Sequence, residues 1–281
     1  MRKRGRIAFT KLEALGNDFV LVDGRDATFS PEPTEIVALA DRHRGIGFDQ
    51  LLALRAANSA DALCRVDVYN SDGSMAEQCG NGMRAVALWL HRRGEFDRTT
   101  TVETAAGPVA LMWESAVSIT ATLPPPDFTP AACGVAGHDR FPIDLPADGE
   151  VVQVLGAALG NPHLVALLQH PPGDDEVRRI GSILSRHPEL ENGANIGFAF
   201  IEAPSCLRLQ VFERGAGPTR ACGSGACAAA TALMRAGHVN GPVEVIQPGG
   251  TLVIDWPGEG EPVTMTGPAS KVFEGVIAWT K

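Results

Sequence analysis

The sequence predicts an α/β (α+β) protein with two pseudo-symmetric halves, each a mixed sheet wrapped around a central helix. The first observation is a repeated segment: "QCGNGMRAVALWL" begins at Gln78, and "ACGSGACAAATAL" begins at Ala221. The second is that strand-like sequence precedes both copies, as "VYN" from Val68 and "VFE" from Val211. The third is that the run after each cysteine is apolar or small on every side, which is typical of a helix buried all round.

The repeat extends well beyond the two cysteines. When Cys79 is aligned on Cys222, an offset of 143 residues, the glycines and alanines of the two helices coincide. Three further blocks, "LGN", Arg-His and "IGF", match in the same order at offsets of 144 to 150 residues. Such ordered matches indicate two homologous halves joined near the proline-rich segment "LPPPDFTP". We expect an N-terminal half at residues 1–124, to which residues 269–281 return, and a C-terminal half at residues 125–268.

Local patterns predict the other elements. The segment "TEIVALADRHR" is expected to form a surface helix over residues 34–44, with Thr34 as its N-cap. A second surface helix is expected over residues 174–187, where acidic side chains occupy the first turn. Gly94 and Gly237 are expected to end the two central helices. Alternating apolar residues predict strands at residues 19–24, 65–70, 198–203 and 207–213.

Composition narrows the class of protein. The chain has 281 residues, 44% of them hydrophobic, which is enough to bury a core. Its net charge of −9 argues against a nucleic-acid or anionic-membrane partner, because both require clustered positive charge. The basic run "MRKRGR" is interpreted as a solvated tail rather than a targeting signal. No run approaches the ~20 apolar residues of a spanning helix. A cytoplasmic location is therefore expected.

The six cysteines do not resemble a disulfide framework. Cys222 and Cys227 are the closest pair, and they lie in an expected helix that begins Gly-Ser-Gly, which makes a zinc site improbable. No metal is expected. Apart from Cys79 and Cys222, the cysteines are interpreted as small core or surface residues: Cys64, Cys133, Cys206 and Cys227.

A cysteine at the first turn of a helix has two chemical consequences. The first N–H groups of a helix have no partner within it, and the aligned peptide dipoles place positive charge there. This lowers the pKa of a thiol at that position. The same N–H groups, at Gly80-Asn81 and at Gly223-Ser224, can bind an anion such as a carboxylate. Each half is therefore expected to present a reactive thiol beside a carboxylate site.

Two such halves placed face to face would direct Cys79 and Cys222 at opposite sides of one α-carbon. One thiolate would remove the α-proton, and the other thiol would return a proton to the opposite face. The helix N–H groups would stabilise the negative charge that develops on the carboxylate. The repeat thus predicts a two-base racemase or epimerase, in which one cysteine is the thiolate and the other the thiol, with the roles exchanged for the reverse reaction.

Other polar residues fit a zwitterionic small-molecule substrate. Glu213 could accept an ammonium group and Arg214 could hold a carboxylate with paired hydrogen bonds, while His163 and Glu213 are candidates to tune the thiols. Simpler interpretations stay open: Arg214 as a surface ion-pair partner, His43 and His187 as structural residues, and the asparagines as turn residues. These asparagines are Asn17, Asn70, Asn161 and Asn195.

The lysine content bears on the cofactor. Racemases that use pyridoxal phosphate hold it on a lysine. All the lysines of this chain lie near its termini, at Lys3, Lys11, Lys271 and Lys281. A mechanism without a cofactor is therefore favoured.

Along its whole length the sequence resembles the diaminopimelate epimerases, cofactor-independent enzymes that interconvert LL- and meso-diaminopimelate. The two cysteine segments are the most specific part of the resemblance. The matching segments are "LGNDFVLVD", "RHRGIGFDQ", "YNSDGSMAEQCGNGMR", "GNPHLV", "ERGAGPTRACGSGAC" and "MTGPA".

The resemblance implies roles for particular residues. Cys79 and Cys222 would be the acid and base, His163 would modulate thiol acidity, and each half would be a barrel-like sheet around its helix. The family usually forms a homodimer. The implied substrate contacts are Asn17, Gln50, Asn70, Gly80, Asn81, Asn161, Asn195, Glu213, Arg214, Gly223 and Ser224.

Some positions depart from the commoner family pattern. None of them removes a catalytic or ligand residue, but Phe273 replaces a tyrosine that often contributes to the dimer contact. The departures are Glu13, Ala14, Ser71, Met75, Ala76, Gly197 and Phe273.

Alternative functions are the same two-thiol chemistry on another amino acid, a binding relative without catalysis, and a thiol hydrolase. A binding protein needs no sulfur, and a hydrolase has no use for a second equivalent cysteine. The two-thiol epimerase therefore explains the repeat best.

Overall fold

The chain divides into two compact units in the computed structural model. One unit combines Met1–Ala121 with Gly267–Lys281, and the other is Thr122–Thr266. The boundaries expected from the repeat, after residues 124 and 268, lie two or three residues further along the chain. The structure describes residues 4–26, 29–76 and 79–280.

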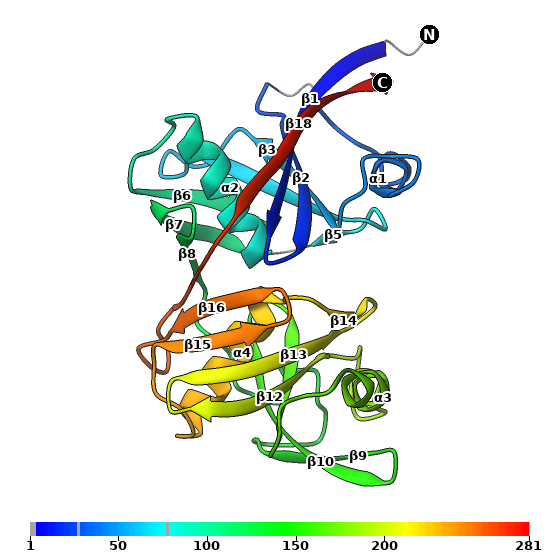
Figure 1. The fold of residues 1–281 in the computed structure, drawn as a ribbon, viewed down its shortest axis with the longest axis vertical. Helices are drawn as coiled ribbons and strands as arrows, with labels where there is room; N and C mark the ends of the chain where they lie inside the picture. Colours follow the sequence, from blue (N-terminus) through cyan, green and yellow to red (C-terminus); the bar gives the residue numbers. More distant parts are fainter. Residues whose placement is uncertain (1–3, 27–28, 77–78, 281) are drawn as a thin grey trace. The chain divides into compact units, whose positions relative to one another are not determined.

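The first unit is a mixed sheet with two helices (Figure 1). Its strands pair in the order β18-β1-β2-β3-β4-β6-β7-β8, with β5 on β4. The pairs β2–β3 and β4–β6 are parallel, and the others are antiparallel. Its elements are β1 (Arg4–Ala14), β2 (Asn17–Asp23), α1 (Pro33–Ala40), β3 (Gln50–Arg55), β4 (Cys64–Asn70), β5 (Met75–Ala76), α2 (Gly80–Arg92), β6 (Thr99–Thr104), β7 (Gly107–Ser115), β8 (Ser118–Leu123) and β18 (Ser270–Thr280).

The second unit repeats this order strand for strand. It reads β9-β10-β11-β12-β13-β15-β16-β17, with β14 on β13, and its parallel pairs are β11–β12 and β13–β15. The predicted fold class, two pseudo-symmetric α+β halves, is confirmed. Its elements are β9 (Ile143–Ala147), β10 (Glu150–Ala158), β11 (Pro162–Leu167), α3 (Asp174–Leu184), β12 (Asn195–Ala203), β13 (Cys206–Glu213), β14 (Gly217–Thr219), α4 (Gly223–Arg235), β15 (Val243–Gln247), β16 (Gly250–Asp255) and β17 (Val263–Gly267).

The parallel strands are buried on both faces, which explains their unbroken apolar runs. In β2 the run from Phe19 to Val22 is fully buried, as a strand covered by helices on both sides requires. Val20 and Val22 pack in one cluster with Ile36 of α1. In the second unit, α3 covers the corresponding strands with Val177, Ile180 and Leu184 against Leu164, Ile196 and Phe198.

The central helices α2 and α4 begin directly after Cys79 and Cys222 and span matching residues of the repeat. Nearly every residue of the first three turns is buried in both, which confirms the predicted all-round burial. Small residues allow the strands to approach: a Cβ on Gly225 would lie 3.0 Å from Val211 Cγ2. Gly94 and Gly237 follow the helices with φ of 71° and 75°, the left-handed conformation that ends a helix.

The two surface helices are shorter than predicted. α1 ends at Ala40 because the Asp41 carboxylate accepts hydrogen bonds from the backbone N–H groups of His43 and Arg44, a turn that replaces the helix. Thr34 is not its N-cap; Glu32 takes that position, and its N–H donates to Glu35 Oε2 at 2.9 Å.

α3 ends at Leu184 rather than His187. Pro188 follows His187, and the residue before a proline disfavours the helical conformation. His187 is buried, and its Nδ1 accepts from the Glu189 N–H, which agrees with a structural role. Within the described ranges, every helix is too short or too polar to cross a membrane.

Candidate active site

The first thiol marks the start of α2. Cys79 is the N-cap, with extended backbone at φ −145°, and its Sγ accepts a hydrogen bond from Gly82 N–H at 3.3 Å. Gly80 and Asn81 form the first turn and are buried. Their N–H groups point out of the helix end, as in any first turn, so an anion beside Cys79 meets partial positive charge.

Three predicted contact residues lie at one end of the same sheet. Asn17 begins β2 and Gln50 begins the parallel strand β3, while Asn70 ends the antiparallel strand β4 and pairs with Gln50. Gln50 Nε2 donates to Asn70 Oδ1 at 2.9 Å. Gln50 Oε1 is buried and accepts no hydrogen bond from the described residues, so it can serve a donor that binds there.

Asn17 is oriented by an ionic network that sequence reasoning missed. Its Nδ2 donates to Asp49 Oδ2 at 2.9 Å, and Arg42 donates to both Asp49 and Asp18 at 2.8 and 2.7 Å. Lys11 is 7% exposed and donates to Asp18 Oδ2 at 2.5 Å and to the Gly47 carbonyl. Burial opposes ionisation of Asp18, but the hydrogen bonds from Arg42 and Lys11 outweigh it and hold its pKa well below the usual range.

The second thiol marks the start of α4. Cys222 is the N-cap and is 6% exposed, and its Sγ lies 3.7 Å from Ser224 Oγ. Its backbone N–H donates to Gln247 Oε1 at 2.9 Å. Gly223 and Ser224 form the first turn, in the positions that Gly80 and Asn81 take in α2.

His163 reaches Cys222 through Ser224. The Nε2 of His163 lies 3.0 Å from Ser224 Oγ and 3.1 Å from Asn161 Oδ1. Burial, with the positive charge of Arg214, lowers the pKa of His163 to about 3, so the imidazole is neutral near pH 7. A neutral imidazole can exchange a hydrogen bond with the Ser224 hydroxyl without adding a charge beside the thiol.

The remaining predicted residues form a second group in this unit. Asn195 pairs with His163 across the parallel strands β11 and β12, and its Oδ1 accepts from Arg214 N–H at 2.9 Å. The Arg214 guanidinium is exposed and donates to the carbonyls of Asn192 and Gly193. These hydrogen bonds, rather than the surface ion pair of the alternative interpretation, hold the Arg214 side chain. Glu213 Oε1 accepts from Thr219 at 2.6 Å.

His163 makes the fold acid-sensitive. In the unfolded chain a histidine binds a proton below about pH 6.5, whereas the folded chain excludes it until about pH 3. The unfolded state thus holds more protons between these values, and unfolding free energy falls by up to ~1.4 kcal/mol per pH unit as the pH drops.

His163→Phe should remove this slope, because phenylalanine has no group that titrates. Phenylalanine is the chosen replacement because the repeat places buried Phe19 at the equivalent position. Urea unfolding at pH 7, 5.5 and 4.5 measures it. Equal slopes for both proteins would show that His163 is not the titrating group.

Over the described ranges, no three His, Cys, Asp or Glu side chains gather as metal ligands would. Lys11 is engaged with Asp18, and Lys271 is exposed beside Glu274 at 3.3 Å. Lys3 and Lys281 lie outside the described residues.

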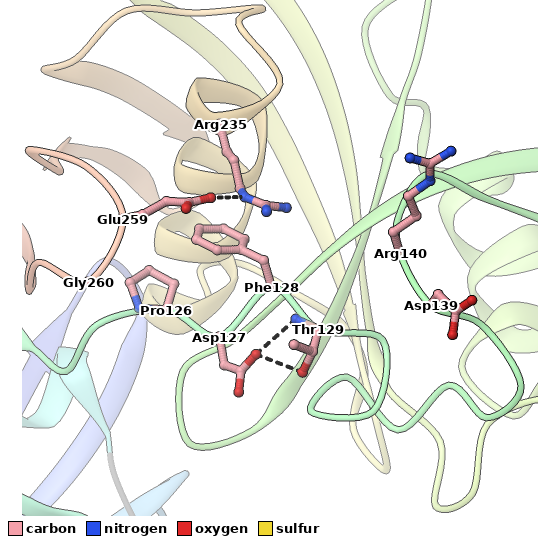
Figure 2. Close-up of a pocket in the computed structure, with 9 residues that line it drawn as sticks. All are labelled: Pro126, Asp127, Phe128, Thr129, Asp139, Arg140, Arg235, Glu259 and Gly260. Carbon is pink, nitrogen blue, oxygen red and sulfur yellow. Dashed lines mark hydrogen bonds and ion pairs between the residues drawn. The ribbon is translucent and has the colours of Figure 1, made fainter.

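A shallow pocket of ≈ 410 Å³ lies elsewhere in the second unit (Figure 2). Arg235, near the end of α4, pairs with Glu259 at 2.5 Å and lies 4.9 Å from the ring of Phe128. No residue predicted for the active site lines this pocket. It belongs to the opposite end of α4 from Cys222.

The two units each carry a cysteine at the mouth of a buried helix, the arrangement expected of a two-thiol isomerase. The sequence model of the family described as diaminopimelate epimerase matches residues 9–124 and 157–272. The chain belongs to the diaminopimelate epimerase family. It is accordingly an enzyme with a small-molecule substrate.

Individual relatives agree with this assignment. A diaminopimelate epimerase of Xanthomonas euvesicatoria pv. vesicatoria is 42% identical, over 97% of each chain. One of Pseudomonas aeruginosa is 39% identical, over 96% of this chain and 99% of its own. A hydroxyproline epimerase from Agrobacterium vitis, solved with trans-4-hydroxy-L-proline, shares the fold, with a TM-score of 0.74 over 99% of this chain and 92% of that chain at 17% identity.

Proposed function

We propose that the chain interconverts LL-2,6-diaminopimelate and meso-diaminopimelate without pyridoxal phosphate, a step of lysine and peptidoglycan precursor biosynthesis. The observation that carries the proposal is a cysteine as N-cap of the buried central helix in both units. Identity of about 40% to curated diaminopimelate epimerases over nearly the full chain supports this choice of substrate.

The chemistry follows from the two thiols. In one direction the Cys222 thiolate accepts the α-proton, and the Cys79 thiol donates a proton to the opposite face of the planar carbanion. The reverse reaction exchanges these roles. Helix N–H groups at Gly80-Asn81 and Gly223-Ser224 stabilise the negative charge that develops on the carboxylate. Neutral His163 keeps the Ser224 hydroxyl oriented toward Cys222.

The polar residues hold the rest of the substrate. Arg214 takes a carboxylate, Glu213 an ammonium group, and the buried Gln50 Oε1 accepts an N–H of the substrate. Glu213 also modulates the acidity of the thiols. The asparagines Asn17, Asn70, Asn161 and Asn195 complete the contacts.

The test is proton NMR of LL-diaminopimelate in D₂O with reduced protein and no added pyridoxal phosphate. Loss of the α-proton signal together with meso product is the expected result. Absence of exchange with reduced thiols would overturn diaminopimelate as the substrate. Exchange with a different amino acid in the same assay would assign the two-thiol chemistry to that substrate.

The enzyme is expected to act in the cytoplasm as a homodimer. The C-terminal strand β18 runs beside β1 (Figure 1). Val272, Phe273 and Val276 are 55, 45 and 52% exposed, and a second copy would cover them. A phenylalanine in place of the family's usual tyrosine keeps the apolar area of this contact.

Phe273→Glu should shift the protein from dimer to monomer, because the new charge would be buried against the partner. Sedimentation velocity measures the shift. Val117→Glu is the matched control, since Val117 is 75% exposed on a turn of the same unit. A wild-type protein that sediments as a monomer, or a dimer that Phe273→Glu leaves intact, would contradict the assignment of this strand.

A further inference from the structure

The turn between β15 and β16 holds the backbone that leads into α4 at two points. Cys222 N–H donates to the side-chain oxygen Oε1 of Gln247, the last residue of β15, at 2.9 Å. Gly249 N–H donates to the Arg220 carbonyl at 2.7 Å. The catalytic cysteine is therefore tethered to a hairpin far along the chain.

Gln247 supplies a bond that the helix cannot supply itself. In many helices a Glu or Gln at the third helical position accepts the N–H of the N-cap residue. That position in α4 is Gly225, where a Cβ would lie 3.0 Å from Val211 Cγ2 and 3.3 Å from Cys222 Sγ. A side chain there would crowd Val211 and Cys222, and Gln247 supplies the acceptor from the neighbouring strand instead.

The other end of the same amide lacks a partner. Gln247 is 5% exposed, and its Nε2 is buried and donates to none of the described residues. The orientation of the amide is fixed, because the Cys222 N–H requires the oxygen and not the NH₂ group. A buried donor without an acceptor is unfavourable, and an acceptor that arises during function would satisfy it.

The first unit has a different side chain at the matching place. Thr104 occupies the matching place, at the end of β6 in the hairpin with β7, and its hydroxyl donates to the Gly107 carbonyl of that hairpin. Gln247 is thus specific to the half that carries Cys222.

We propose that Gln247 is a positioning residue for Cys222: its oxygen fixes the cysteine backbone at the mouth of α4, and its buried NH₂ group donates to the sulfur when Cys222 is a thiolate. This inference rests on the proposed function, in which Cys222 accepts a proton. A donor that bonds the thiolate but not the thiol favours the proton-accepting form.

Alkylation of Cys222 across pH, without substrate, tests the proposal. Iodoacetamide labelling is followed by fragment mass spectrometry, which separates Cys222 from Cys227. Gln247→Glu keeps the acceptor for Cys222 N–H but replaces the donor with a negative oxygen, and should raise the labelling midpoint by about one pH unit or more. Gln247→Met removes both groups and should raise it by less. Labelling of Cys79 serves as the internal reference and should not change.

Steady-state kinetics separates this role from substrate binding. At neutral pH we expect kcat to fall about tenfold in Gln247→Met, with partial recovery at higher pH and KM within about twofold. Thr104→Val, the matched control in the other hairpin, should leave the labelling of Cys222 unchanged.

An unchanged midpoint in both Gln247 variants would overturn the proposal, as would a rise in KM alone, which would assign the donor to the substrate. Loss of thermal stability with unchanged labelling would reduce Gln247 to a structural residue. Since labelling needs no substrate, failure of the diaminopimelate assay would not affect this test.

Discussion

Cys79→Ala and Cys222→Ala should each lower the rate of epimerisation by roughly 10²–10⁴-fold, while the fold is retained. Removing one thiol removes either the base or the acid in each direction, and a positioned acid or base contributes roughly 10²–10⁴-fold. Each cysteine lies at a helix mouth, where alanine fits the available space. Proton NMR in D₂O measures epimerisation and α-proton exchange separately.

The pattern of residual exchange is the sharper result. A variant with one thiolate can still remove and return a proton on its own face, without inversion. Each variant should therefore exchange the α-proton of one stereoisomer, and the favoured isomer should differ between Cys79→Ala and Cys222→Ala. Cys227→Ala, a buried cysteine further along α4, is the matched control and should stay active. Full epimerisation by either single variant would refute the two-base mechanism.

Asp18→Asn should destabilise the first unit by about 3 kcal/mol. The substitution leaves Lys11 buried without its ionised partner, and breaking one side of a buried pair is costly. It also loosens Arg42 and Asp49, which orient Asn17, so activity should fall as well. Urea unfolding gives the free energy, and hydrogen exchange of β1 and β2 amides localises the loss.

The pH dependence provides a second readout. The pKa of Asp18 is lowered in the folded chain, so its ionised form stabilises the fold above about pH 4, and this stabilisation is lost as the pH falls further. The gap between wild type and Asp18→Asn should therefore be widest near neutrality. Glu202→Gln breaks an exposed pair with Arg208 and should cost much less, because exposed ion pairs contribute little to stability. If both variants lower the free energy of unfolding by the same amount, Lys11 and Asp18 do not behave as a buried ion pair.

Local sequence was sufficient for the elements with strong short-range signals. The glycine after each cysteine, the small residues that follow, and the glycines at positions 94 and 237 set both ends of the central helices. The helix ends that sequence reasoning misplaced depend on single side chains, the Asp41 carboxylate and Pro188. Pro188 was a readable signal, because proline restricts the residue before it.

Site residues divide in the same way. The cysteines and the helix N–H groups follow from a pattern within a few residues, and the asparagines, Glu213 and Arg214 follow from motifs. The contact of Lys11 with the Gly47 carbonyl and the cap on Cys222 by Gln247 join residues 36 and 25 positions apart. A lysine in a strand, or a glutamine before "PGG", does not by itself indicate which distant residue it contacts. Aligning the two halves of the repeat could have drawn attention to Gln247, because Thr104 occupies the equivalent position in the first half.

The sequence by itself determined the duplication, the mixed strands around a buried helix in each half, and the placement of a thiol at each helix mouth. These depend on side-chain size, backbone freedom and periodicity, which act over a few residues. Only the tertiary structure decided that His163 reaches Cys222 through Ser224, that β18 pairs with β1, and that Gln247 holds the Cys222 backbone. Such contacts arise when strand pairing brings distant residues together, because hydrogen bonds and ion pairs depend on distance in space rather than separation along the chain.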